Sequence, residues 1–280
     1  MGLYVDNLII GFPCGDKAAR AQIGVFLKEY TARFKCSEHV VPKLFCGMKV
    51  DRDFKARTLK LSMGHYIKEV SKKFLNASTK PFTTPVRTSP IDAFLKLDAT
   101  EDEEKAAMRD KPYLSIMGCL LWIATTACPD IAYHASFLCQ VMQSPSRAAY
   151  DASIAVLSYL DNTKELGITF DGNKPLLEVY TDASWLLSPK PFAGHVIMYC
   201  GATISYSARK LKIIPQSTAE AETAAYANAA KDLRFVLNVL HFLEGKCKTL
   251  VKIMCDNSAT MSTIMKPGVT GRTKHYTNWL

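Results

Sequence analysis

Residues 176–183 decide the fold of the C-terminal part, and they read Leu176-Leu177-Glu178-Val179-Tyr180-Thr181-Asp182-Ala183. Apolar and β-favouring residues dominate this stretch, and turn residues follow it, a pattern typical of a strand. Residues 194–199 and 203–207 repeat the pattern. A long helix is predicted from Ser217 to about Glu244, followed by a fourth strand at 250–255. The predicted order is β-β-β-α-β.

Three acidic residues occupy informative places in this order. Asp182 lies on the first strand, Glu222 in the first turns of the helix, and Asp256 at the end of the fourth strand. If the first and fourth strands are neighbours, the three carboxylates converge on one edge of the sheet and form a site for a hard cation. Mg²⁺ prefers such oxygens, and two ions can support phosphodiester cleavage. Judged from position alone, strand-end aspartates are more often turn residues.

Glu220 and Glu222 are expected to have different roles. Ser217 and Glu220 fit a capping box, in which Glu220 returns to the Ser217 backbone amide. Glu222 instead aligns with Ala225, Ala229 and other small or apolar residues on a stripe suited to close packing on the sheet. Glu222 is therefore the predicted metal ligand.

The N-terminal half has a different texture. Residues 3–11 predict a hairpin with Asp6-Asn7 at its tip, and residues 43–61 predict short strands around a charged turn at 51–53. Helices are predicted at 21–34, 65–75, 113–127, 130–143 and 148–160, and a surface linker at 76–111.

Composition excludes several classes of protein. Hydrophobic residues make up 48% and charged residues 22% of the 280 residues, as in a soluble globular protein of two compact units. The longest apolar stretch is too short to span a membrane, and no secretion signal is present. The nine cysteines are scattered without a CxxC pair, which predicts reduced thiols in a reducing, intracellular compartment, cytoplasmic or nuclear, and no zinc site.

Positive charge is concentrated at the two ends of the chain, whose net charge is +9. Such a surface suits a polyanionic partner, although many basic proteins bind no nucleic acid specifically. Two groups are candidate phosphate contacts, and a solvated basic face is the alternative for the first: Arg209, Lys210 and Lys212 before the long helix, and Arg272, Lys274 and His275 near the end.

Four blocks resemble the ordered ribonuclease H motifs of copia-type LTR-retrotransposon polyproteins: YTDASW at 180–185, QSTAEAE at 216–222, CDNSA at 255–259 and RTKH at 272–275. Upstream, YVDN at 4–7 resembles that family's YVDD polymerase motif, and PDIA at 129–132 and VLSYL at 156–160 resemble its connecting helices. The resemblance covers essentially the whole chain.

The resemblance implies an α/β and α+β architecture in three parts. Residues 1–88 would be the C-terminal part of a reverse transcriptase, with its palm hairpin, and 89–170 a linker and connecting helices. Residues 171–280 would be a ribonuclease H-like mixed sheet with helices, incomplete at its C-terminus. The implied activity is hydrolysis of RNA in RNA:DNA hybrids, with Mg²⁺ or Mn²⁺ held by Asp182, Glu222 and Asp256, and the rest of the polyprotein as a partner.

Departures from the family pattern keep a second interpretation open. Asn7 stands where the family has a second aspartate, and a neutral amide is a poorer Mg²⁺ ligand, so polymerase activity is not expected. The family's last strand and the helix with a fourth aspartate have no counterpart before Leu280, so hydrolysis by this chain is expected to be impaired. These departures favour a non-catalytic nucleic-acid-binding remnant of a decayed element. An unrelated α/β metal phosphohydrolase would explain the N-terminal motif poorly.

Overall fold

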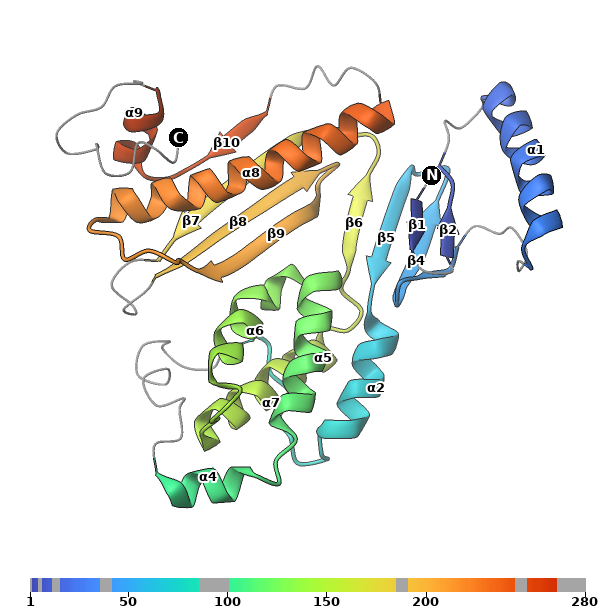
Figure 1. The fold of residues 1–280 in the computed structure, drawn as a ribbon. Coiled ribbons are helices and arrows are strands. Elements are labelled where there is room, and N and C mark those ends of the chain that lie inside the picture. The colour runs from blue at the N-terminus through green and yellow to red at the C-terminus, as the bar shows by residue number, and fades with distance from the viewer. Residues whose placement is uncertain are drawn as a thin grey trace. The chain divides into compact units, whose positions relative to one another are not determined.

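The structure is a computed structural model that describes residues 2–4, 7–11, 16–35, 42–85, 101–184, 191–244 and 251–265. The chain forms two compact units, residues 1–46 and 47–280. Figure 1 shows their helices and strands. The division falls inside the predicted 1–88 segment, and the boundaries predicted at 88/89 and 170/171 stay predictions.

The first unit contains the predicted N-terminal hairpin. Strands β1 (Gly2–Tyr4) and β2 (Asn7–Ile9) pair antiparallel, with Tyr4 opposite Asn7. Helix α1 (Lys17–Arg33) follows, capped by Asp16, whose side chain accepts a hydrogen bond from the Ala19 backbone at 2.9 Å. A two-residue strand, β3 (Leu44–Phe45), ends the unit. The hairpin prediction is thus confirmed in its strands, but Asp6 lies outside the described residues.

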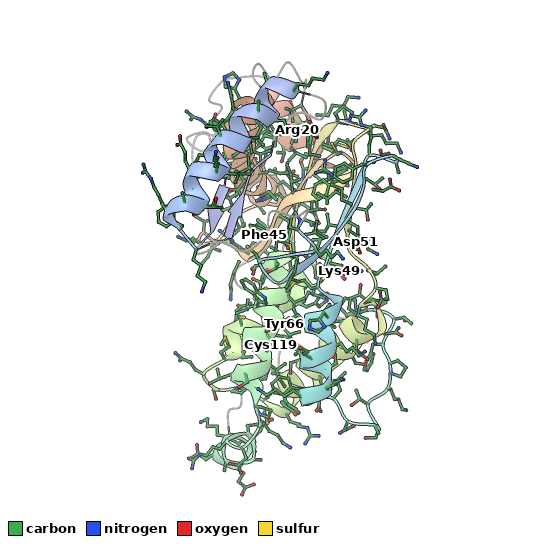
Figure 2. The ribbon with its side chains drawn as sticks, turned by 90° about the vertical axis from the view of Figure 1, so that its right-hand side faces the viewer. Arg20, Phe45, Lys49, Asp51, Tyr66 and Cys119 are labelled. Atoms are coloured by element: carbon green, nitrogen blue, oxygen red, sulfur yellow. The ribbon has the colours of Figure 1, made fainter. Side chains whose placement is uncertain are left out.

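The second unit begins with strands β4 (Met48–Asp53) and β5 (Thr58–Ser62), which pair antiparallel. The predicted turn at 51–53 is wrong, because these residues complete β4 and the chain turns over residues 54–57. The Asp53 carboxylate explains the later turn, since it accepts hydrogen bonds from the backbone N–H groups of Lys55 and Ala56. Lys49 and Asp51 form an exposed ion pair of 2.9 Å on β4 (Figure 2).

Strand β6 (Ile168–Asp171) pairs antiparallel with β5 and was not predicted. Gly167 allows its approach, because a Cβ at this position would lie 2.5 Å from the Leu61 carbonyl oxygen. Strand β6 therefore joins β4 and β5, which lie far upstream in the chain.

A bundle of helices forms the larger core of this unit. Its members are α2 (Gly64–Phe74), α5 (Tyr113–Thr126), α6 (Ala132–Leu138) and α7 (Arg147–Asn162), with the 3₁₀ turns η1 (Pro129–Ile131) and η2 (Cys139–Val141) on either side of α6. Fully buried side chains such as Ile116, Leu120 and Leu157 fill the centre. Tyr66 of α2 meets Cys119 of α5 (Figure 2), and burial raises the pKa of the Tyr66 hydroxyl to about 12. The helices predicted at 65–75, 113–127 and 148–160 are confirmed within one or two residues.

One helix prediction and the linker prediction need correction. Of the helix predicted at 130–143, only Ala132–Leu138 is α-helical, with a 3₁₀ turn on either side. The predicted linker at 76–111 contains helix α4 (Asp102–Met108), whose first turn holds Asp102, Glu103 and Glu104. Acidic residues at a helix N-terminus interact favourably with the helix dipole, so the charge run starts a helix.

The second sheet is built from the predicted C-terminal strands. It contains β7 (Leu177–Ala183), β8 (Phe192–Tyr199), β9 (Ala202–Lys210) and β10 (Lys252–Met254), in the order β10-β7-β8-β9. Neighbouring strands are antiparallel except β10 and β7, which are parallel. Helix α8 (Thr218–Glu244) packs along one face (Figure 1), and α9 (Ser258–Met265) follows β10. The predicted β-β-β-α-β order and the pairing of the first and fourth strands are confirmed.

Helix α8 packs on the sheet through small residues. Ala221, Ala225 and Ala229 are at most 1% exposed, and Leu233 continues the stripe. Alanine favours the helix intrinsically and lets the helix approach the strands closely. This close packing puts Glu222, which is adjacent in sequence to Ala221, at the surface of the sheet.

Candidate metal centre

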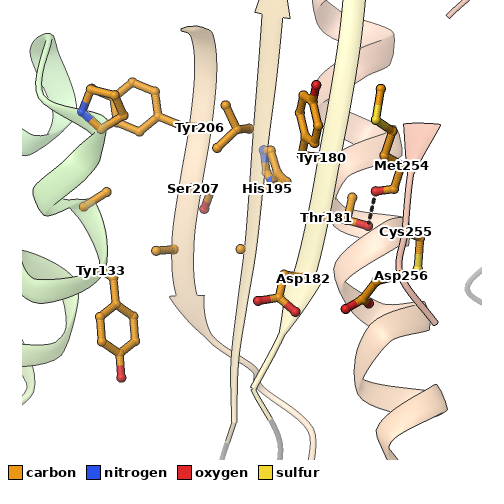
Figure 3. Close-up of a pocket in the computed structure, with 15 residues that line it drawn as sticks. Tyr133, Tyr180, Thr181, Asp182, His195, Tyr206, Ser207, Met254, Cys255 and Asp256 are labelled. Carbon is orange, nitrogen blue, oxygen red and sulfur yellow. Dashed lines mark hydrogen bonds between the residues drawn. The ribbon is translucent and has the colours of Figure 1, made fainter. Parts of the chain in front are cut away.

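The parallel pairing of β7 and β10 aligns two of the predicted carboxylates. Met254 lies opposite Tyr180 in the register, so two residues further along each chain Asp256 comes beside Asp182. Neighbouring strands are about 4.8 Å apart. Figure 3 shows the two side chains next to each other, with a hydrogen bond from Thr181 Oγ1 to the Met254 carbonyl oxygen joining the strands above them.

Glu222 reaches the same edge from helix α8. Its side chain is anchored by one oxygen, Oε1, which accepts a hydrogen bond of 3.2 Å from the backbone N–H of Ala183, the residue after Asp182. The residue is only 3% exposed, and its second oxygen, Oε2, has no hydrogen-bond partner among the described residues. A buried carboxylate oxygen without a partner is costly, which suggests that a cation belongs beside it.

Among the described residues, two of the predicted ligands form a group of possible metal donors with a cysteine. A carboxylate oxygen of Glu222, a carboxylate oxygen of Asp256 and Cys255 Sγ all lie within 4.8 Å of one another. Asp182 is not a member of this set, although its charge acts on Glu222. Sequence reasoning treated Cys255 as a core thiol, whereas it is free and partly exposed. Its position next to Asp256 at a strand end was the signal that could have identified it.

The electrostatics of Glu222 reflect this crowding. Burial and, to a smaller extent, the negative charges of Asp182 and Asp256 raise the pKa of the Glu222 carboxyl to about 7, against the opposing effect of the Ala183 hydrogen bond. A divalent cation would favour the ionised form of all three carboxylates. The residues at this edge therefore fit a hard cation such as Mg²⁺.

Glu220 has the structural role predicted for it, with one difference. The Glu220 backbone N–H donates to Ser217 Oγ at 3.2 Å, as a capping box requires. The Glu220 carboxylate, however, accepts from the Gln216 N–H at 2.6 Å, one residue before the predicted partner. Glu220 is buried, and its carboxylate is used in this hydrogen bond, so we do not assign it as a metal ligand.

The first group of predicted phosphate contacts, Arg209, Lys210 and Lys212, does not form one patch on the sheet. Arg209 and Lys210 belong to the end of β9 and not to the turn after it, where Lys212 lies. Successive strand residues face opposite sides, so Arg209 and Lys210 do not share a face, and Lys210 Nζ donates to Gln140 Oε1 at 2.8 Å. Arg272, Lys274 and His275 lie outside the described residues.

A groove of about 570 Å³ lies on the face of the sheet opposite α8. Asp182, Asp256 and Cys255 lie at one end of it, and Tyr133 of α6 lies on the other side, as Figure 3 shows. Tyr180, on the same strand as Asp182, is 40% exposed. The carboxylates are therefore reached from an open, partly aromatic surface.

Comparison with known proteins shows which class of protein this chain resembles. The chain is 29% identical over 98% of its length to a retrovirus-related Pol polyprotein from transposon TNT 1-94 of Nicotiana tabacum, and covers 20% of that protein. It is also 29% identical, again over 98% of its length, to the Pol polyprotein of transposon RE2 from Arabidopsis thaliana, and covers 18% of it. A transposon Ty5-1 protein of Saccharomyces cerevisiae is 28% identical over 79% of this chain and 70% of its own length.

Over 98% of its length the chain is similar to retrovirus-related Pol polyproteins from transposons. Its relatives are copia-type elements, so the resemblance predicted from the ordered sequence blocks is confirmed. The chain spans about one fifth of the length of the tobacco and Arabidopsis polyproteins. No family model and no solved structure matches it.

Among the helices in the described part of the chain, none combines the length and the apolarity needed to cross a membrane.

Proposed function

We propose that the second sheet and helix α8 form a ribonuclease H-like centre that hydrolyses the RNA strand of RNA:DNA hybrids, within a reverse transcriptase/ribonuclease H region. The observation that carries the proposal is Glu222, 3% exposed with one unpaired oxygen, placed by α8 against Ala183 and beside Asp256. The β-β-β-α-β order, in which the last strand β10 pairs parallel with the first strand β7, agrees with the ribonuclease H resemblance.

Each carboxylate has a distinct place in the proposed centre. Asp182 and Asp256 stand at the ends of parallel strands and open onto the groove, so they would hold cations facing the substrate. Glu222 is fixed from behind by Ala183 and would bind with its free oxygen. When bound, Mg²⁺ supplies an activated water and stabilises the leaving oxygen in phosphodiester hydrolysis.

The groove suggests how the substrate would lie. A nucleic acid strand placed along the sheet face opposite α8 would pass Tyr180 and bring a phosphodiester to Asp182 and Asp256. Exposed aromatic rings can stack on bases or riboses without sequence preference. Arg209, Lys212 and the basic residues near the chain end remain proposed phosphate contacts.

The proposal is tested by cleavage of a labelled RNA:DNA hybrid in Mg²⁺ or Mn²⁺. Asp182→Asn and Asp256→Asn should each lower the rate by at least about 100-fold, equivalent to about 2.7 kcal/mol. Glu178→Gln is the matched control, because Glu178 lies on the same face of β7 as Asp182, four residues earlier. Equal loss in all three variants, or cutting that needs no divalent cation, would contradict the proposal.

Asn7, which replaces the second aspartate of the polymerase motif, favours the second candidate, a non-catalytic nucleic-acid-binding remnant. That candidate predicts hybrid binding without cleavage, even in Mn²⁺. Retention of binding after all three carboxylates are neutralised, with no cutting by the unaltered chain, would support it over the nuclease.

A further inference from the structure

We infer that Cys255 gives the carboxylate edge a second mode of cation binding, in which its thiolate joins Glu222 and Asp256 around a thiophilic divalent ion of the Zn²⁺ class. This soft site shares two residues with the proposed Mg²⁺ site. Its capacity to compete with Mg²⁺ rests on the proposed function, whereas the binding of the soft ion does not.

The first support is geometry. The donor atoms of Cys255, Glu222 and Asp256 lie within 4.8 Å of one another. A tetrahedral ion bonded at about 2.3 Å to sulfur and about 2.1 Å to oxygen keeps its donors about 3.5 Å apart. Movements of about 1 Å, by rotation of the Asp256 and Cys255 side chains, complete such a site.

The local backbone explains why neighbouring residues can bind together. Side chains at consecutive positions of a strand point to opposite faces. Strand β10 ends at Met254, so Cys255 and Asp256 have left the strand and are free of that alternation. Cys255 is also a free, partly exposed thiol on the lining of the groove, so an ion can reach it from solvent.

The second support is independent of the cysteine. Glu222 is 3% exposed, and Oε2 has no partner among the described residues although the other oxygen is anchored to Ala183. A buried carboxylate with one satisfied and one unsatisfied oxygen is oriented for a ligand. The cluster is therefore more than an exposed thiol near an acidic pair.

Donor chemistry separates the two modes. Mg²⁺ takes oxygen ligands and gains nothing from sulfur, so it would use Asp182, Glu222 and Asp256. Zn²⁺ and Cd²⁺ bind thiolate strongly, so they would exchange Asp182 for Cys255. Binding replaces the S–H bond with a sulfur–metal bond and releases one proton to solvent, without oxidation or reduction.

The test is a titration of the full 280-residue chain with Cd²⁺, followed by the ultraviolet thiolate-to-cadmium charge-transfer band. We expect the band to saturate at one Cd²⁺ ion per chain. The band should be lost in Cys255→Ser and kept in Cys200→Ser. Cys200 is a matched control because it is another partly exposed cysteine and follows β8 in the same sheet. Glu222→Gln should weaken the apparent affinity by more than about tenfold, since losing one partner of a metal site typically costs about 10–100-fold.

A band that persists in Cys255→Ser would overturn the inference, because one of the other cysteines would then hold the ion. An unchanged affinity in Glu222→Gln would overturn it too, since the thiol would be binding alone.

Competition separates this inference from the proposed function. If both are correct, excess Mg²⁺ shifts the Cd²⁺ titration to higher concentration. If the band depends on Cys255 and Glu222 but Mg²⁺ has no effect, the soft site stands and the proposed Mg²⁺ site fails.

Discussion

Glu222 is the residue on which the account of the site depends. A carboxyl group is rarely buried without a partner, because its charged form loses hydration. Here one oxygen accepts a hydrogen bond from the Ala183 N–H, the other has no partner in the part of the chain that the structure describes, and two further carboxylates lie nearby. Without a cation, this residue should destabilise the folded chain at neutral pH.

The pH dependence of the free energy of unfolding tests whether Glu222 destabilises the folded chain. The pKa of Glu222 is raised from 4.5 to about 7, so its favourable contribution is complete below about pH 4.5 and is lost as the pH rises through 7. In metal-free buffer, Glu222→Gln should therefore gain roughly 1–3 kcal/mol of unfolding free energy over the unaltered chain between pH 5 and pH 8. Denaturant unfolding at both pH values measures the gain.

Glu103→Gln is the control for loss of one negative charge, because Glu103 lies exposed in the first turn of α4. A gain of the same size in both variants, or in neither, would mean that the surroundings of Glu222 do not carry the effect.

Cys255 is the residue of the cluster that the sequence analysis missed. Asp182, Glu222 and Asp256 were found because acidic residues near strand ends and in a first helical turn stand out along the chain. Cys255 lies next to Asp256 at the end of the same predicted strand. In the sequence alone, however, it resembles the other scattered cysteines. Its role depends on β10 ending at Met254, which sequence periodicity predicts only to within a few residues.

At the scale of elements, local patterns predicted most of the strands and helices, and non-local contacts account for the failures. The elements from β7 to α8 were predicted because each is long enough to show its own periodicity, and the short strand β10 was predicted because it lies in the mostly apolar stretch 250–255. Strand β6 has four residues, and its existence depends on pairing with β5, which lies far upstream. The turn after β4 was misplaced because Asp53 organises the next residues through its side chain.

The pairing of β6 with β5 requires a residue without a side chain at position 167, and this requirement can be tested. A Cβ there would lie 2.5 Å from the Leu61 carbonyl oxygen, so Gly167→Ala must displace backbone and should destabilise the second unit by roughly 1–3 kcal/mol. Gly118→Ala is the matched control, because an exposed site in α5 with no atom within 4 Å should gain up to about 1 kcal/mol from helix propensity. Thermal unfolding of the two variants should move in opposite directions, and parallel shifts would contradict the close approach.

At the scale of the whole molecule, the chain combines two compact units and is similar over 98% of its length to Pol polyproteins of transposons. The ordered blocks in the sequence predicted the relationship, since their order and spacing are specific where each block alone is not. The sheet order then explains why blocks that are far apart in the chain share one edge: β10 returns to pair with β7, and α8 crosses the sheet between them.

Cation binding by the carboxylate edge is the central claim, and it can be measured without relying on catalysis. Unfolding of the intact chain at pH 8 should be compared with and without Mn²⁺, in the unaltered protein and in the triple variant Asp182→Asn, Glu222→Gln and Asp256→Asn. A ligand at 100 times its dissociation constant adds about 2.7 kcal/mol of stability. We predict a stabilisation that rises with Mn²⁺ concentration in the unaltered chain and disappears in the triple variant. Equal stabilisation of both proteins, or of neither, would contradict the account.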